Sequence, residues 1–154
     1  MEATLAQSLS QILLHLVFST KNREQWIVTE IQPRLHAYLA GACHAIGSQA
    51  YRIGGTKDHV HIACALPRTL TVSSLLEEIK KSSSAWMKEQ GEEYAKFKWQ
   101  AGYGVFSLGQ SQLPVLLRYI ENQNEHHRTR TFQEELLEIL KRYGVEYDER
   151  YLWD

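Results

Sequence analysis

The sequence predicts an α+β protein built on a ferredoxin-like split βαβ unit: an antiparallel sheet with helices on one face, followed by two extra C-terminal helices. Three observations predict this fold. The length of 154 residues fits about one domain. The composition, 44% hydrophobic and 23% charged, is that of a globular protein. The expected elements follow the order strand, helix, strand, strand, helix, strand, helix, helix. We therefore expect residues 1–154 to form a single domain.

The first strand and helix are predicted by local patterns. Residues 11–19, QILLHLVFS, are rich in large and β-branched apolar side chains, which is typical of a buried strand. Thr29 and Gln32 have the spacing of a capping box, and apolar residues then recur at helical spacing. We expect Gly47 to end this helix.

A hairpin and a second helix come next. Residues 49–53 and 58–66 are expected to be strands joined by the turn sequence GGTK. Apolar residues between Val72 and Trp86 mark one face of a helix that we expect Gly91 to close.

The rest of the chain supplies one strand and two helices. Residues 98–108 are predicted to form the fourth strand, and a third helix is expected from about residue 111 to 126. Thr131 and Glu134 form a capping box for the last helix, which Gly144 ends.

The sequence predicts a soluble, cytoplasmic protein. Cys43 and Cys64 are too few for a disulfide framework and too far apart for a CxxC motif. The first ten residues hold no Lys or Arg, so they lack the basic start of a signal peptide. The longest apolar run is far shorter than the ~20 residues of a membrane span.

The net charge of −1 argues weakly against a nucleic-acid binder, but its distribution is uneven. Residues 1–130 hold 14 Lys and Arg against 11 Asp and Glu, a net charge of +3. Residues 131–154 hold 3 against 7, a net charge of −4. We expect this acidic segment to lie away from the functional residues, which leaves a mildly basic part that permits a phosphate partner.

Two histidines share one side of the third strand. Side chains alternate along a strand, so His59 and His61 project from the same face and can hold one metal ion. Alone, this pattern also fits a pair of surface-facing or hydrogen-bonded histidines. Asp58 is interpreted as a turn residue, with the alternative that it orients a metal-bound histidine.

A second polar group lies on the third helix. Tyr119 and Gln123 are four residues apart and therefore neighbours on one stripe, which continues through Asn122 and His126. Taken singly, Tyr119 fits a half-buried tyrosine and Gln123 a solvated residue. We interpret His126 as a solvated helix end, with a competing metal ligand as the alternative.

These residues resemble the HUH endonucleases. Residues 57–61, KDHVH, are similar to the histidine–hydrophobe–histidine motif of that group. Residues 119–123, YIENQ, are similar to the nucleophile helix of its single-tyrosine transposases, the small enzymes of bacterial insertion sequences. Residues 99–107 and 147–153 are similar to the same transposases and to their relatives associated with repeated palindromes.

The resemblance implies a role for each matching residue. His59 and His61 would be two ligands of a divalent metal, Mg²⁺ or Mn²⁺, and Gln123 the third. Tyr119 would be the catalytic nucleophile, which attacks a DNA phosphodiester and leaves a 5′-phosphotyrosine and a 3′-hydroxyl. A phenol with a pKa of about 10 is a weak nucleophile at neutral pH, and a metal that polarises the phosphate compensates for this.

The resemblance also implies the partner and the assembly. Such transposases excise and insert single-stranded DNA marked by hairpins. They typically work as homodimers in which the tyrosine helix of one subunit completes the histidine site of the other. A monomer is the alternative, and the hairpin sequence, cleavage site, physiological metal and mobility of the element stay open.

Three other functions are weighed against the transposase. One is another HUH nuclease, such as a replication initiator or relaxase. The second is a noncatalytic, domesticated protein that binds single-stranded DNA or hairpins. A zinc hydrolase of small substrates ranks lowest, because the sequence shows no carboxylate base near the histidine pair.

Overall fold

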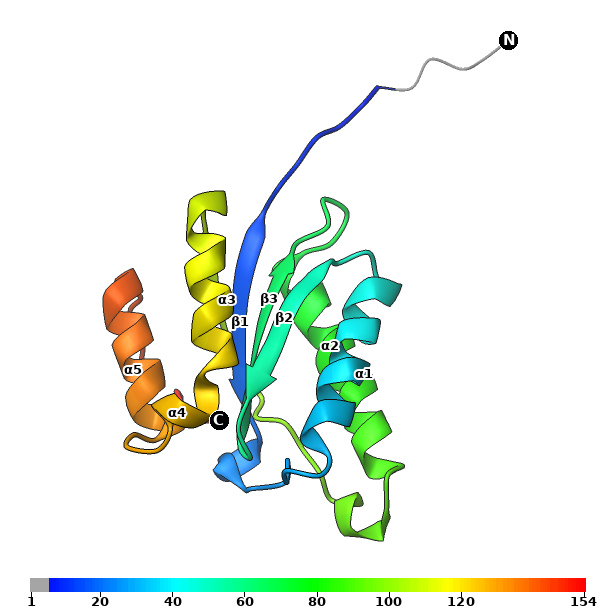
Figure 1. The fold of residues 1–154 in the computed structure, drawn as a ribbon, viewed down its shortest axis with the longest axis vertical. Helices are drawn as coiled ribbons and strands as arrows, with labels where there is room; N and C mark the ends of the chain where they lie inside the picture. Colours follow the sequence, from blue (N-terminus) through cyan, green and yellow to red (C-terminus); the bar gives the residue numbers. More distant parts are fainter. Residues whose placement is uncertain (1–5) are drawn as a thin grey trace.

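The structure, a computed structural model, describes residues 6–154 (Figure 1). Residues 1–5, which belong to the N-terminal segment without Lys or Arg, lie outside the described residues. The strands are β1 (Leu13–Ser19), β2 (Ala50–Gly55), β3 (His59–Ala65) and β4 (Gly104–Leu108). The α-helices are α1 (Gln32–Ala45), α2 (Val72–Lys88), α3 (Leu113–Glu121), α4 (Gln123–His126) and α5 (Phe132–Tyr143). Short 3-10 helices span Lys21–Arg23, Glu92–Tyr94 and Gln110–Gln112.

The four strands form one antiparallel sheet in the order β2-β3-β1-β4. This order, with α1 between β1 and β2 and α2 between β3 and β4, is the ferredoxin-like arrangement that the sequence predicts. In the register of the central pair, His59 lies opposite Ser19 and His61 opposite Val17. The histidine pair therefore lies in the middle of the sheet.

Helices cover both faces of the sheet (Figure 1). α1 and α2 pack on one face over the main core, where Leu16 and Phe18 of β1 meet Leu35 and Leu76. The extra C-terminal helices α3 and α5 pack on the opposite face, which carries the alternate side chains of β1. All seven residues of β1 are buried, as expected for a strand covered on both faces.

The fourth strand is shorter than predicted, because the backbone of residues 100–102 has other partners. The Lys80 ammonium donates to the carbonyl oxygens of Gln100, Ala101 and Gly102 at 2.7, 3.2 and 2.9 Å. Trp99 makes only an isolated bridge to Thr20, and regular pairing starts at Gly104.

Two helix boundaries also differ from the prediction. α1 starts at Gln32 without a side-chain cap, because the Gln32 amide donates to the Ile27 carbonyl instead of closing a capping box with Thr29. The third helix is divided in two at Asn122, where α3 ends and α4 starts. The capping box of Thr131 and the αL stop at Gly144 in α5 are confirmed.

A glycine lets α3 lie directly on the sheet. A Cβ atom added at Gly54 of β2 would lie 2.4 Å from the Ile120 carbonyl oxygen of α3. Only a residue without a side chain allows this approach. Over residues 6–154, every helix is too short or too polar to cross a membrane.

Candidate active site

β3 presents His59 and His61 to the face covered by α3–α5, and both side chains are fully buried. The Nδ1 atom of His59 lies 2.8 Å from the Asp58 carboxylate and 3.1 Å from the Thr56 hydroxyl. These contacts hold the ring so that Nε2 faces the interior. Asp58 therefore has the orienting position that the sequence offered as the alternative to a simple turn residue.

His61 is oriented by a residue to which the sequence assigned no role. The His61 Nδ1 atom lies 2.7 Å from Nε2 of His15, a buried neighbour on β1. In the tautomer that donates from Nδ1 to His15, Nε2 of His61 has a lone pair for a metal, whereas in the other tautomer Nε2 donates to the Glu135 carboxylate. Burial is the main reason why the pKa of each ring is lowered from 6.5, so the two rings are neutral at neutral pH.

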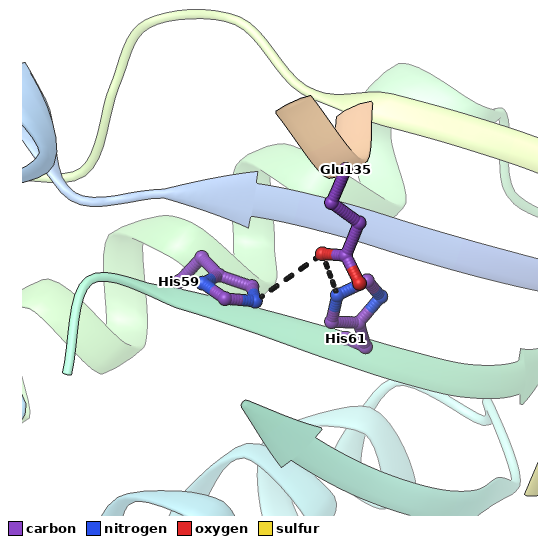
Figure 2. Close-up of side chains that lie close together, drawn as sticks. All are labelled: His59, His61 and Glu135. Atoms are coloured by element: carbon purple, nitrogen blue, oxygen red, sulfur yellow. Dashed lines mark hydrogen bonds and ion pairs between the residues drawn. The ribbon is translucent and has the colours of Figure 1, made fainter. Parts of the chain in front are cut away.

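A buried carboxylate completes the histidine pair. Glu135 of α5 places Oε1 3.0 Å from Nε2 of His61 and 3.5 Å from Nε2 of His59 (Figure 2). His127, after α4, lies 3.0 Å from the same oxygen. Ligand atoms of His59, His61 and Glu135 lie within 4.8 Å of one another. The expectations that the acidic segment is remote and that no carboxylate lies near the pair are therefore wrong.

Tyr119 and Gln123 reach the same cluster. Gln123 Oε1 lies 2.8 Å from His59 Nε2, and the Gln123 amide donates to Glu135 Oε2 at 3.1 Å. The Tyr119 hydroxyl donates to the same carboxylate oxygen. All four residues singled out in the sequence, His59, His61, Tyr119 and Gln123, thus meet in one chain around Glu135.

The cluster fixes the ionisation of its two acidic groups. Burial alone would raise the pKa of Glu135, but hydrogen bonds from His127 and His61 hold it well below its usual range. Burial and the nearby Glu135 carboxylate raise the pKa of Tyr119 above 10. Glu135 is therefore ionised and Tyr119 protonated at neutral pH.

The donors fit a divalent metal. Two imidazole nitrogens, a carboxylate oxygen and the Gln123 amide oxygen converge, and this mixed set suits borderline and hard divalent cations. The far nitrogen of each histidine is held by a neighbour, Asp58 or His15, as is usual for metal-binding histidines.

His126 has a role other than the solvated helix end expected of it. Its ring stacks on Tyr119 with centroids 4.6 Å apart. Its Nε2 atom is buried and, among the described residues, has no hydrogen-bond partner. His126 therefore packs against the tyrosine, whereas its neighbour His127 binds Glu135.

Comparison with known proteins points to one family. The sequence model of the family described as "Transposase IS200 like" matches residues 8–123. The transposases for insertion sequence element IS200 of Salmonella typhimurium and Salmonella typhi are each 26% identical over 132 residues. Each alignment covers 82% of this chain and 86% of the relative.

Two solved structures share the fold. A proposed transposase from Deinococcus radiodurans R1 has a TM-score of 0.61 at 20% identity, over 79% of this chain and 98% of that one. A REP-associated tyrosine transposase bound to a REP hairpin has a TM-score of 0.59 at 16% identity, over 82% and 74%. Glu135 lies outside the segment that the family model matches.

Proposed function

The chain belongs to the IS200-like transposase family, whose members cleave and transfer DNA strands, and from this premise we propose that it acts on single-stranded DNA through Tyr119. The observation that carries the proposal is the meeting of the Tyr119 hydroxyl and Gln123 with the buried pair His59 and His61. We further propose that residues 1–154 form one transposase domain.

In the proposed reaction the Tyr119 oxygen attacks a phosphodiester of the strand. The bond from oxygen to phosphorus forms as the bond from phosphorus to the 3′ oxygen breaks, which leaves a 5′-phosphotyrosine and a 3′-hydroxyl. The phenol proton is lost and the departing 3′ oxygen gains one, so no net proton is consumed. Attack by another 3′-hydroxyl reverses the step and rejoins the strand without a nucleoside triphosphate.

The protein residues supply position and ligands. Glu135 Oε2 accepts the hydrogen bond of the Tyr119 hydroxyl and thereby orients the attacking oxygen. His59, His61 and Gln123 would hold a divalent metal, Mg²⁺ or Mn²⁺, with Glu135 as a further ligand. When bound, the metal polarises the phosphate and offsets the weak nucleophilicity of a protonated phenol.

The proposed DNA partner is a single strand marked by a hairpin. Support comes from the solved relative that is bound to a REP hairpin and shares this fold.

Covalent capture of the strand tests the role of Tyr119. Wild-type protein incubated with a labelled single-stranded hairpin and Mn²⁺ is expected to form an adduct that survives denaturing electrophoresis. Tyr119→Phe should form none, and Tyr147→Phe, at an exposed tyrosine, should form it normally. An adduct in the Tyr119→Phe protein, or none in the wild type, overturns the proposal.

We also propose that the protein is a homodimer, and the origin of each site can be tested. In the structure Tyr119 and His59 meet within one chain. When Tyr119→Phe protein is mixed with His59→Ala protein, sites built within one chain stay inactive. Sites completed between subunits regain adduct formation in such a mixture.

A further inference from the structure

A cavity of about 350 Å³ separates α3 from α5 on the surface next to the proposed nucleophile. Its lining includes Tyr119 and His15, which are part of the cluster already described, and Val115, which is 60% exposed. The cavity therefore runs from solvent to the reactive side chain. Its volume falls at the low end of the roughly 300–1,000 Å³ of small-ligand sites, a size that suits one nucleobase rather than a larger group.

The outer end of the cavity carries an aromatic platform. The Tyr143 ring stacks on Phe106 of β4, with centroids 4.8 Å apart and planes at 24°. Phe106 is buried and fixes the ring from behind, while Tyr143 stays 44% exposed. A ring that is held on one side and open on the other is the arrangement on which unpaired bases stack.

The charge of the cavity suits a nucleic-acid strand. Arg142 lines it, and its side chain is 66% exposed, with the Glu138 carboxylate 3.6 Å away as a loose partner. Within the part of the chain that the structure describes, the lining contains no carboxylate. The remaining walls are mainly apolar, with Leu116 on one side and Ile139 on the other.

We propose that this cavity binds one unstacked nucleobase of the cleaved strand, adjacent to the scissile phosphate, with Tyr143 stacking on the base and Arg142 binding a neighbouring phosphate. The inference rests on the proposed function, because it takes its ligand from the reaction of Tyr119. Arg142 and Tyr143 lie outside residues 8–123, so the cavity adds a contact beyond the segment matched to the family.

Binding without cleavage tests this proposal separately from the chemistry. Fluorescence anisotropy measures the Kd of the Tyr119→Phe protein for a short oligodeoxythymidine strand and for an abasic strand of equal length. Adding Tyr143→Ala should weaken oligodeoxythymidine binding by about 5- to 150-fold and leave abasic binding unchanged. Adding Arg142→Gln should weaken both, because the phosphates are common to the two strands.

Two further variants guard against misfolding. Tyr143→Phe keeps the ring and should bind oligodeoxythymidine normally. Val115→Trp leaves α5 unchanged but fills the mouth of the cavity, and should weaken oligodeoxythymidine binding selectively. Equal losses for both strands with Tyr143→Ala, or none, overturn the proposal. The proposal is also overturned if Tyr143→Ala changes the protein from a dimer to a monomer in sedimentation and leaves DNA binding unchanged, because the cavity would then be a protein interface. Failure of the proposed function is detected separately, as the absence of a Tyr119 adduct in the wild-type protein.

Discussion

The contact between Gly54 and α3 leads to a quantitative prediction about Tyr119, the proposed nucleophile. In Gly54→Ala, the new methyl carbon would lie 2.4 Å from the Ile120 carbonyl oxygen and 2.8 Å from its Cγ2 atom. Cβ atoms hardly ever come closer than 3.0 Å to another heavy atom, and ordinary contact starts at 3.4 Å. α3 must therefore retreat by about 0.6–1.0 Å, and Tyr119 precedes the displaced residue.

The expected cost has two parts. Overpacking of this kind destabilises a protein by roughly 1–3 kcal/mol, which urea unfolding measures. A shift of about 1 Å in a reacting group lowers its rate by roughly 100-fold, even where folding survives. We therefore expect single-turnover adduct formation by Gly54→Ala to slow by about two orders of magnitude, with little change in DNA affinity.

Gly41→Ala is the matched control. A Cβ at Gly41 in α1 meets nothing within 4 Å, so the same substitution there should keep the wild-type rate and stabilise the helix by up to about 1 kcal/mol. The reasoning is refuted if folded Gly54→Ala protein forms the adduct at the wild-type rate. It is equally refuted if Gly41→Ala loses as much activity as Gly54→Ala.

Three more substitutions test other contacts. Asp58→Ala removes the partner of His59 Nδ1 and should weaken Mn²⁺ binding about 10- to 100-fold in calorimetric titration, whereas unchanged affinity would rule out the orienting role. Ser83→Ala leaves the buried Trp99 indole NH without its acceptor and should cost roughly 1–3 kcal/mol in urea unfolding; a wild-type midpoint would contradict this. Burial lowers the pKa of His36 from 6.5, so below that pH the unfolded chain binds a proton that the folded chain does not. The free energy of unfolding should therefore fall as the pH drops through about 6.5, and less steeply in His36→Leu; equal slopes would show that the ring does not contribute.

Much of the candidate site could be predicted from the sequence, because local periodicity decides which side chains share a face. His59 and His61 share a face through the two-residue period of a strand, and Tyr119 and Gln123 through the turn of a helix. These relations are set within one strand or one helix and do not depend on the elements that pack against it. Even with the helix divided at Asn122, Gln123 contacts His59 and the Tyr119 hydroxyl donates to Glu135.

The contributions of α5 and Lys80 could not be predicted in the same way. Glu135 reaches the histidines only because α5 folds back over the sheet, a long-range contact that no local spacing encodes. The sequence held one signal: Glu135 lies on the apolar face of its helix, between Phe132 and Leu136, where a charged side chain that is buried needs partners. Similarly, the sequence predicts one strand over residues 98–108, but the ammonium of Lys80 binds the carbonyl oxygens of residues 100–102.

The alternation along β1 separates scaffold from chemistry. Leu16 and Phe18 face the core beneath α1 and α2, whereas His15 and Val17 face the side that holds Glu135. Consecutive residues of one strand thus serve different purposes: one packs in the core and the next faces the candidate site. Because the sheet separates the two layers, the side that holds the candidate site could be redesigned for another DNA strand or metal. The layer with α1 and α2 would keep the protein folded.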